Sequence, residues 1–437
     1  MTSTLRRAGG FAAVGTLALA VPALGAAVAV PFAVIAALAA FAVHDGPLFE
    51  LFARPGDRQD GRLNGLAGFA LAATGLALLA TVPETPMPAA VFVAAVLVLA
   101  YGNLGEQLVR RIHADPFLSV AGFTAAGFLA GVAGQLAVDS LVDGVLGLPA
   151  AIFLSATGAL VAALLRSVLY ERDDPLVMLS VGLLLWLFDF LAIDASGFVV
   201  VTALVVTVVL GYASYALGTA SVPGMLTGVL LGLLTIVLGG FGWFAVLISF
   251  FAVGGLSTKF RYESKRRRGV AEDNDGARGS GNVLGNAAVA LVAVLCFAAS
   301  PHLPIDESVF LFAFAGSLAA AMSDTLSSEI GGLYDNPRLI TSFERVAPGT
   351  DGGITWQGEL AGVGGSALVA VIAAALLPLG SPVVGGGVVA LGGVVGMTVD
   401  SVLGATVEGD RVGNQTVNFL ATLTGAVASA ALAAVLL

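Results

Sequence analysis

The sequence is poor in the residues that soluble proteins use for disulfides, metal sites and solvation. It has a single cysteine, which excludes a disulfide framework and a cysteine-ligated metal site. Its three histidines, at 44, 113 and 302, are too scattered for a histidine-rich zinc site. Charged residues make up only 11% of the 437 residues and hydrophobic residues 58%, whereas soluble domains carry about 25% charged residues. This composition excludes a soluble enzyme, a disordered chain and a nucleic-acid binder, and indicates a polytopic membrane protein.

Lysine is also scarce. Only two of the 19 basic residues are lysines, and the net charge is −10. An acidic, lysine-poor chain is typical of halophilic organisms, so we expect a salt-loving source.

Long apolar runs dominate what remains, and a membrane span needs about 20 such residues. The runs are too long for barrel strands, and open sheet edges do not occur in lipid, so the sequence predicts an all-α bundle of roughly 13–15 transmembrane helices. The first run is not expected to be a cleaved signal peptide, because apolar residues continue to Val43. The candidate spans are 9–24, 27–43, 64–82, 89–106, 117–138, 148–169, 175–193, 197–217, 222–238, 241–258, 283–300, 308–323, 358–377, 382–403 and 415–437.

Charged residues gather in alternate loops. The loops at 83–88, 139–147, 301–307 and 378–381 hold almost no lysine or arginine. The positive-inside rule places the basic loops in the cytoplasm of a multi-pass cell-membrane protein. Those loops are the N-terminus, 44–62, 106–115, 166–174, 259–278 and 335–351. The basic run Lys265–Arg268 is interpreted as a topology anchor near anionic lipid, with attraction of a nucleotide as the alternative.

The loop at 218–223 predicts a boundary between two transmembrane domains, 1–218 and 219–437. Unusual polar motifs concentrate in the second. The 57 glycines suit close helix packing in lipid, as at 385–387 and 392–393.

The first polar motif joins the end of one span, 254–260, to the start of the next, 281–286. Glycines, hydroxyls and Lys259 can surround phosphate oxygens, although the spacing is not that of a P-loop. The alternative for Lys259 is a lysine that snorkels to the membrane interface. Asn282 and Asn286 lie four residues apart on one helical face, where they either cap the helix or bind a ligand.

Two further motifs, 323–331 and 400–406, bring carboxylates to the ends of apolar spans. Asp324 and Ser328 share a helical face, and ionisable residues in such places usually face a polar cavity. Carboxylate oxygens suit Mg²⁺ that is shared with a phosphate, so Asp324, Glu329 and Asp400 are predicted to form one metal-binding set. The alternatives are helix capping in 323–331 and a lone interfacial carboxylate at Asp400.

The fourth motif runs from Pro337 to Glu359. Arg338 can grip a phosphate with two hydrogen bonds. The glycine-rich stretch 348–353 precedes a helix start, which is an anion site in principle, although a simple turn is the alternative. Together the motifs predict an acidic, glycine-rich cytoplasmic mouth with the parts that phosphoryl transfer needs, and no Ser-His-Asp set is visible.

These motifs resemble the signature segments of one integral-membrane family. The segments are SDTLSSEIG (323–331), PRLIT…PGTDGG (337–353), DSVLGAT (400–406) and STKF…NVLGN (257–286). The family, named for a domain of unknown function, includes the plant phytyl-phosphate kinase of vitamin E synthesis, and the resemblance covers about 219–437.

The resemblance implies a kinase that converts a long-chain isoprenyl monophosphate to the diphosphate, with CTP or another nucleoside triphosphate as donor. Its expected partners are the isoprenoid lipid phosphate, the nucleotide, Mg²⁺ and membrane lipids, with no nucleic acid. The expected catalytic residues are Lys259, Asp324, Ser328, Glu329, Arg338 and Asp400. The expected cofactor-binding residues are Asn282, Asn286, Gly349, Thr350, Gly352, Gly353, Ser401 and Asn418.

The first half resembles the dolichol/phytol kinase family more distantly. Gly102-Asn103 with Glu106, and the acidic segment 171–175, correspond to a Gly-Asp pair and an Asp-Asp-Asn…Pro segment of that family. Asn103 replaces the expected aspartate, which weakens metal binding. This half is therefore interpreted as a diverged, inactive kinase-like domain or a helical scaffold, with a second active kinase as the alternative.

Other classes of function remain open at this point. A cytidylyltransferase acting on a lipid phosphate would use similar groups. A transporter or lipid flippase would line a path with polar residues from both faces to the midplane, whereas these motifs cluster on one face. A non-catalytic membrane scaffold is the third possibility.

Overall fold

The computed structural model describes residues 3–142, 146–169, 173–193, 195–271, 277–409 and 412–437. The chain divides into two compact units, unit 1 (1–201) and unit 2 (202–437). The division falls earlier than the boundary expected at 218/219, and each unit is described by itself.

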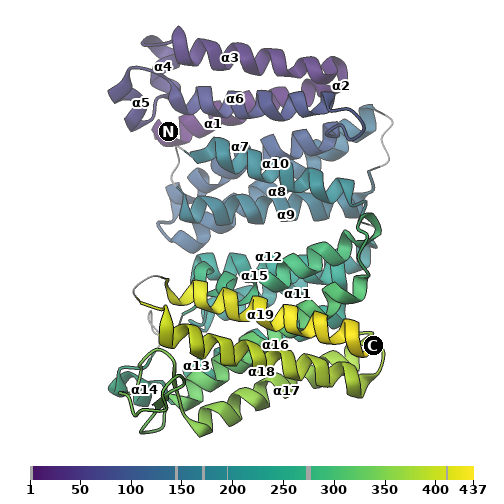
Figure 1. The fold of residues 1–437 in the computed structure, drawn as a ribbon. Coiled ribbons are helices and arrows are strands. Elements are labelled where there is room, and N and C mark those ends of the chain that lie inside the picture. The colour runs from purple at the N-terminus through teal and green to yellow at the C-terminus, as the bar shows by residue number, and fades with distance from the viewer. Residues whose placement is uncertain (1–2, 143–145, 170–172, 194, 272–276, 410–411) are drawn as a thin grey trace. The chain divides into compact units, whose positions relative to one another are not determined.

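The expected all-α membrane bundle is confirmed. Within the described residues, 13 helical segments are long and apolar enough to cross a membrane. Helices make up most of both units (Figure 1).

Unit 1 is built from helices whose starts carry clear sequence signals. Proline stands in the first turn of the helices at 116–141, 148–168 and 174–190. Its missing backbone N–H costs nothing there, because N–H groups in the first turn have no acceptor within the helix. Its elements are α1 (Ser3–Thr16), η1 (Leu17–Ala20), α2 (Val21–Leu24), η2 (Gly25–Val28), α3 (Ala29–Phe41), α4 (Gly46–Phe52), α5 (Pro55–Asp60), α6 (Asn64–Leu78), η3 (Leu79–Thr81), α7 (Ala89–Ile112), α8 (Pro116–Leu141), α9 (Leu148–Val168) and α10 (Asp174–Phe190).

The apolar stretch 4–41 forms two passes rather than one. Gly25 has φ +55°, which takes the chain out of the helical path between α1 and α3. The chain then returns, because α4, which follows α3, contacts α1, and Arg7 donates to the carbonyl of Ala53 at 3.5 Å. Two separate spans were expected here, at 9–24 and 27–43.

Helix α11 (Gly197–Ala216) runs from unit 1 into unit 2. In unit 2, Ser221, Asp306, Thr355 and Ser381 cap their helices through side-chain oxygens. Unit 2 continues with α12 (Val222–Gly239), α13 (Phe241–Lys259), α14 (Tyr262–Arg268), α15 (Ser280–Ala298), η6 (Ser300–His302), α16 (Glu307–Gly331), β1 (Arg338–Leu339), β2 (Gly353–Ile354), α17 (Trp356–Leu376), α18 (Pro382–Thr406) and α19 (Asn414–Leu436).

Glycines let the central helices of unit 2 pack at close range. A Cβ on Gly396 of α18, or on Gly425 of α19, would lie 2.4 or 2.6 Å from the Cβ of Ala320 on α16. Gly392 and Gly393 also meet neighbouring helices, as expected, whereas Gly387 has open space beside it. Small residues thus fix α16, α18 and α19 against one another, and these helices carry the polar motifs.

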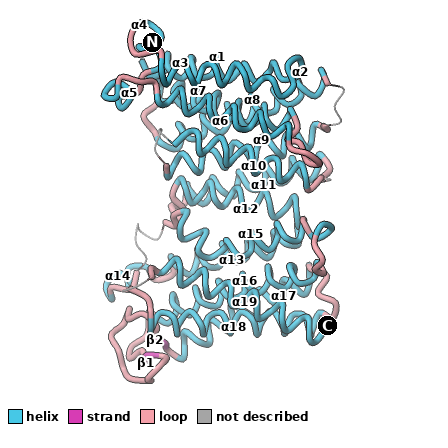
Figure 2. The backbone as a smooth tube through the Cα atoms, turned by 45° about the horizontal axis from the view of Figure 1, so that its top comes forward, coloured by secondary structure: helices cyan, strands magenta, loops and turns pink. Residues whose placement is uncertain are grey.

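The segment expected to be a glycine-rich turn is a small folded loop. Strands β1 and β2 pair antiparallel, with Arg338 opposite Ile354 and Leu339 opposite Gly353. This loop and α14 lie at the same end of unit 2 (Figure 2). Val270 contacts Gly349 there, so the charged loops 259–278 and 335–351 meet at one end of this unit. Their cytoplasmic location stays a prediction.

Candidate functional site

A pair of carboxylates lies where α16 and α18 approach each other. The side chains of Asp324 on α16 and Asp400 on α18 are half-buried, and their carboxyl groups are within hydrogen-bonding distance. The Oδ2 atom of Asp400 is buried and receives no hydrogen bond from the described residues. Two carboxylates at this separation repel each other unless a proton or a cation lies between them. The pair therefore holds either a shared proton or a cation.

Further acidic side chains surround the pair. Glu359 in the first turn of α17 and Glu408 just after α18 are close enough to interact electrostatically with Asp324. Burial raises the pKa of Glu408 to about 7, and the charges of Asp351 and Asp400 add to that rise. Asp351 and Glu359 lie in the fourth sequence motif but were not among the expected site residues, and Glu408 lies outside all of the motifs. More acidic side chains therefore lie around the Asp324–Asp400 pair than the sequence predicted.

Glu329 does not join the carboxylate pair. It lies five residues after Asp324, which is roughly 140° around the helix, and its buried carboxylate forms an ion pair with Lys265 of α14. No group of three or more acidic, histidine or cysteine side chains is placed to hold a metal ion within the part of the chain that the structure describes. The expected three-carboxylate set is therefore reduced to Asp324 and Asp400.

Lys265 is a structural residue that the sequence did not single out. Its side chain is 1% exposed, and its ammonium group donates to the carbonyls of Ser257 and Thr258 at 2.7 and 3.2 Å. It thereby caps the end of α13 and joins it to Glu329 on α16. The sequence predicts that the run Lys265–Arg268 is a topology anchor near anionic lipid, and nothing in its pattern separates this lysine from the arginines that follow it.

The glycine-rich loop is pressed against α18 one turn beyond Asp400. Gly352 has φ +72°, and a Cβ there would lie 2.5 Å from the nitrogen of Ala405 and 2.6 Å from the carbonyl oxygen of Ser401. Only glycine fits this left-handed backbone at such close approach. The amide of Gly353 donates to the carbonyl of Thr350 at 2.9 Å. The loop thus brings Gly352 next to Ser401, which follows Asp400 in the sequence.

Other expected site residues are used locally. The exposed guanidinium of Arg338 donates to the carbonyl of Phe343 at 2.6 Å, and the hydroxyl of Thr350 donates to the carbonyl of Ala347 at 2.8 Å. Gly349 has φ +84° and packs beside Val270. Ser328 is exposed on α16. None of these side chains is shown against the carboxylate pair in the described part of the chain.

Asparagine and glutamine side chains lie at the starts of α15 and α19 in unit 2. Asn286 on α15 is buried and donates to the carbonyl of Asn282 at 3.0 Å. The buried Oδ1 of Asn282 has no hydrogen-bond partner among the described residues. Gly281 packs against the side chain of Gln415 on α19, the helix that also carries the half-buried Asn418. Lys259, at the end of α13, lies 5.8 Å from the ring centre of Tyr262.

The residues present fit a magnesium ion. Mg²⁺ is usually held by one or two carboxylates together with substrate phosphates, rather than by a complete cage of protein ligands. Asp324 and Asp400 supply two such carboxylates, and the buried Oδ2 of Asp400 still needs a partner. The chemistry that this arrangement supports is binding of a divalent cation that is shared with a phosphorylated ligand.

Comparison with known proteins places the polar half of the chain in one group. The family model described as "Integral membrane protein DUF92" matches residues 205–426. The uncharacterized membrane protein MJ0933 of Methanocaldococcus jannaschii is 34% identical over 210 residues, which is 47% of this chain and 82% of that protein.

Two plant proteins are also similar. The chloroplastic protein VTE6 of Arabidopsis thaliana is 33% identical over 144 residues, which is 33% of this chain and 43% of VTE6. Protein PGR of the same plant is 30% identical over 239 residues, which is 48% of this chain and 80% of PGR. No solved structure matches the chain. The extent of the family match and the coverage of the archaeal relative show that this chain belongs to the DUF92 family of integral membrane proteins.

Proposed function

We propose that unit 2 is a membrane prenyl-phosphate kinase. It transfers a phosphoryl group from a nucleoside triphosphate, with CTP as the proposed donor, to an isoprenyl monophosphate. The observation that carries this proposal is the Asp324–Asp400 pair, with its buried oxygen that lacks a partner, at one end of a helical membrane bundle. The similarity to VTE6, together with the resemblance to the family of the plant phytyl-phosphate kinase, supports the same class of substrate.

Asp324 and Asp400 would hold Mg²⁺, which neutralises phosphate charge during phosphoryl transfer. The close contact of Gly352 with Ser401 and Ala405 keeps the loop against the helix that carries Asp400. Lys259 and Arg338 are proposed to move from their local contacts onto phosphate oxygens when substrate binds. Lys265 ties the end of α13 to Glu329 of α16 through its hydrogen bonds and its ion pair.

The proposed reaction moves one phosphoryl group from the nucleotide to the isoprenyl monophosphate. A phosphate oxygen of the isoprenyl monophosphate forms a bond to the γ-phosphorus of the nucleotide, and the bond from that phosphorus to the β–γ bridging oxygen breaks. The products are the isoprenyl diphosphate and a nucleoside diphosphate. The acceptor tail is proposed to lie in lipid between the helices, while the nucleotide reaches the site from the cytoplasm.

The test uses the purified full-length protein in detergent at high salt, with Mg²⁺, labelled CTP or ATP, and phytyl monophosphate. We expect a labelled prenyl diphosphate, and a loss of turnover of about 100-fold or more in Asp324→Asn, because one metal ligand is removed. Glu344→Gln is the matched control, since Glu344 is an exposed carboxylate in the β1–β2 loop.

Product analysis separates the alternatives. Release of pyrophosphate would identify a cytidylyltransferase instead of a kinase. Absence of any lipid product from folded protein, with flux of a lipid phosphate across liposomes, would identify a transporter. Normal turnover in Asp324→Asn would contradict the proposed site.

A further inference from the structure

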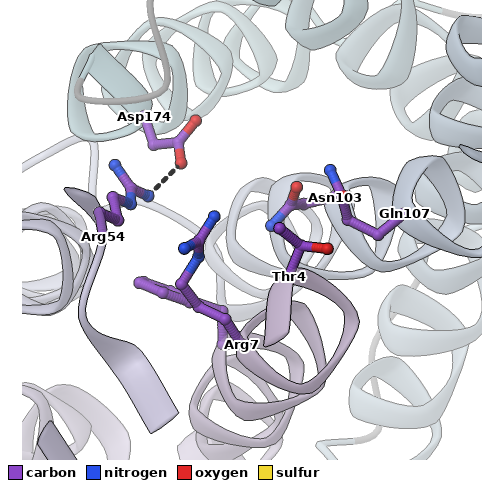
Figure 3. A pocket seen from close by; sticks show the side chains of 7 residues that line it. Thr4, Arg7, Arg54, Asn103, Gln107 and Asp174 are labelled. Carbon is purple, nitrogen blue, oxygen red and sulfur yellow. Dashed lines mark hydrogen bonds and ion pairs between the residues drawn. The ribbon is translucent and has the colours of Figure 1, made fainter. Parts of the chain in front are cut away.

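The carboxylate of Asp174 in unit 1 is neutralised within the fold. Arg54 donates to its Oδ2 atom at 2.6 Å (Figure 3), and Arg166 of α9 forms an ion pair with its Oδ1 atom and donates to Glu106 at 3.2 Å. The pocket beside these residues, which Arg7 and Arg54 help to line, has a volume of about 10 Å³. That is room for about one water molecule. The ion pairs therefore balance the charge of this carboxylate, and the pocket has no space for a substrate.

The Asp324–Asp400 pair of unit 2 lacks such a balance at one atom. The buried Oδ2 atom of Asp400 has no hydrogen-bond partner among the described residues. A bound Mg²⁺ would meet this atom, but two carboxylates fill only part of the octahedral shell that Mg²⁺ requires. Helix α19 packs against both α16 and α18, the helices that carry the pair (Figure 1). A side chain of α19 can therefore contribute a further ligand.

Glycines bring α16, α18 and α19 into contact at successive levels. At the first level, a Cβ on Gly316 of α16 or on Gly392 of α18 would lie 2.7 or 2.9 Å from the carbonyl oxygen of Gly425 on α19. Both glycines therefore approach the same backbone atom of α19, which sets the register of the three helices.

The second level lies four residues later on α18. A Cβ on Gly396 would lie 2.8 Å from the carbonyl oxygen of Ala421. The contact on α19 has moved back by four residues, so α19 runs antiparallel to α18. One further step of four residues brings Asp400 level with Val417 and Asn418 on α19. Such a step is about 6 Å along a helix, at about 1.5 Å per residue.

Asn418 lies on the face of α19 that packs against the other two helices. It begins a stripe of residues spaced four, three and four positions apart, which share one helical face: Asn418, Thr422, Gly425 and Ser429. A Cβ on Gly316 or Gly392 would lie 2.1 or 1.9 Å from the hydroxyl oxygen of Ser429, so this face contacts both α16 and α18. The register and the face together place the half-buried amide of Asn418 beside the carboxylate pair.

An amide at this position offers an oxygen without a charge. The carbonyl oxygen of asparagine accepts hydrogen bonds and binds cations, and an asparagine holds one of the two Mg²⁺ ions in protein kinases. Glu359 and Glu408 already add negative charge around Asp324. A further carboxylate would repel the phosphate that shares the cation, whereas an amide does not.

We propose that Asn418 is the third protein ligand of the cation, through its amide oxygen, and that its lack of charge keeps the site open to a phosphate. The inference rests on the function proposed above for the identity of the cation and of the phosphorylated ligand. It assigns to α19 a part in the site that the two carboxylates do not supply.

The test measures cation binding rather than turnover. Purified full-length protein in detergent, without nucleotide, is titrated with Mn²⁺, and free Mn²⁺ is followed by electron paramagnetic resonance. Asn418→Leu keeps the approximate size of the side chain and removes its oxygen, so affinity for Mn²⁺ should fall about 10-fold or more. Thr416→Val is the matched control, because Thr416 is exposed and lies two residues away, on the opposite side of α19.

A second variant tests the role of the missing charge. Asn418→Asp keeps an oxygen ligand of the same shape and adds a negative charge. Its affinity for Mn²⁺ should equal or exceed that of the wild type, while binding of CTP in the presence of Mn²⁺ should weaken about 10-fold.

Each outcome decides the proposal. Wild-type affinity for Mn²⁺ in Asn418→Leu, at an unchanged melting temperature, overturns it even if Asp324→Asn loses the ion. Weaker Mn²⁺ binding in Asn418→Leu supports it even if the wild type forms no lipid product, so failure of the kinase proposal is a separate result. Wild-type protein that binds no more Mn²⁺ than Asp324→Asn overturns the ligand and the cation site together. If Asn418→Leu does not fold, unchanged affinities of Asn418→Asp for Mn²⁺ and CTP overturn the proposal.

Discussion

The two units gather charge in opposite ways. In unit 1 every carboxylate of the network around Asp174 and Glu106 is met by arginines, and two arginines line the pocket beside it. In unit 2 Asp324 and Asp400 face each other, with Glu359 and Glu408 nearby. The same kind of helical bundle thus pairs its buried carboxylates with arginines in one unit and brings two carboxylates together in the other. The first arrangement stabilises the folded unit through ion pairs, and the second favours a cation that a phosphate can share.

The largest expected difference between the units is the change in stability when one carboxylate is removed from each. Asp174→Asn leaves Arg54 and Arg166 without their shared partner in a buried position, which should lower the free energy of unfolding by about 3–5 kcal/mol. Asp400→Asn instead relieves repulsion, so without Mg²⁺ it should leave stability unchanged or raise it. Denaturant unfolding of both variants in the same detergent measures the difference.

The effect of Mg²⁺ on stability provides the control for the comparison of Asp174→Asn with Asp400→Asn. Binding to the folded protein should stabilise the wild type, and Asp400→Asn should lose that gain. Equal destabilisation by the two substitutions, with an unchanged response to Mg²⁺, would show that the two networks have the same role.

Two glycines sharpen the contrast between the two units. Gly352→Ala puts a Cβ 2.5 Å from the backbone nitrogen of Ala405 at φ +72°, so it should destabilise unit 2 by about 2 kcal/mol or more. Gly65→Ala in unit 1 puts a Cβ 2.8 Å from Nε of Arg54, a side chain held by Asp174, but Gly65 has an ordinary helical backbone, so this substitution should cost less than Gly352→Ala. Melting temperatures of both variants test this order, and a larger effect at Gly65 would reverse it.

The smallest expected effect is a pH dependence in unit 2. The pKa of Glu408 is raised from 4.5 to about 7, chiefly by burial, so the folded state favours the protonated carboxyl. Its contribution to stability is present below about pH 4.5 and is lost as the pH rises through about 7. Glu408→Gln should flatten that part of the stability profile. Thermal melts across this range measure it, and identical profiles for wild type and variant would contradict the assignment.

The sequence predicted the bundle because its apolar runs leave few alternatives in lipid. It also placed Asp324 and Asp400 on the same side, since both end spans that lead into predicted cytoplasmic loops. Their meeting depends on close packing by Gly396 and Gly425, and the glycine pattern indicated such contacts without naming the partners. The pairing of Glu329 with Lys265 depends on where α14 folds back, which periodicity does not determine.

The residues around the pocket of unit 1 show what the charges of single loops do not predict. Asn103, Glu106 and Asp174 were noted as weak motifs, whereas Arg54 and Arg166 were counted only as charges that orient the chain. Tertiary contacts join these residues across separations of 60 to 120 positions. The arginines therefore serve in a buried network as well as in topology, and sequence spacing carries no signal of that second role.

The position of the paired carboxylates along their helices bears on how the protein is made. Asp324 stands seven residues before the end of α16 and Asp400 six before the end of α18, or roughly 10 Å from each helix end. A charged side chain near a helix end is easier to insert into a bilayer than one at its centre, because it can still reach water. Each helix can therefore enter the membrane alone during synthesis. The repulsive pair forms only afterwards, when α16 and α18 associate. The cation site therefore adds no free-energy cost to the insertion of either helix.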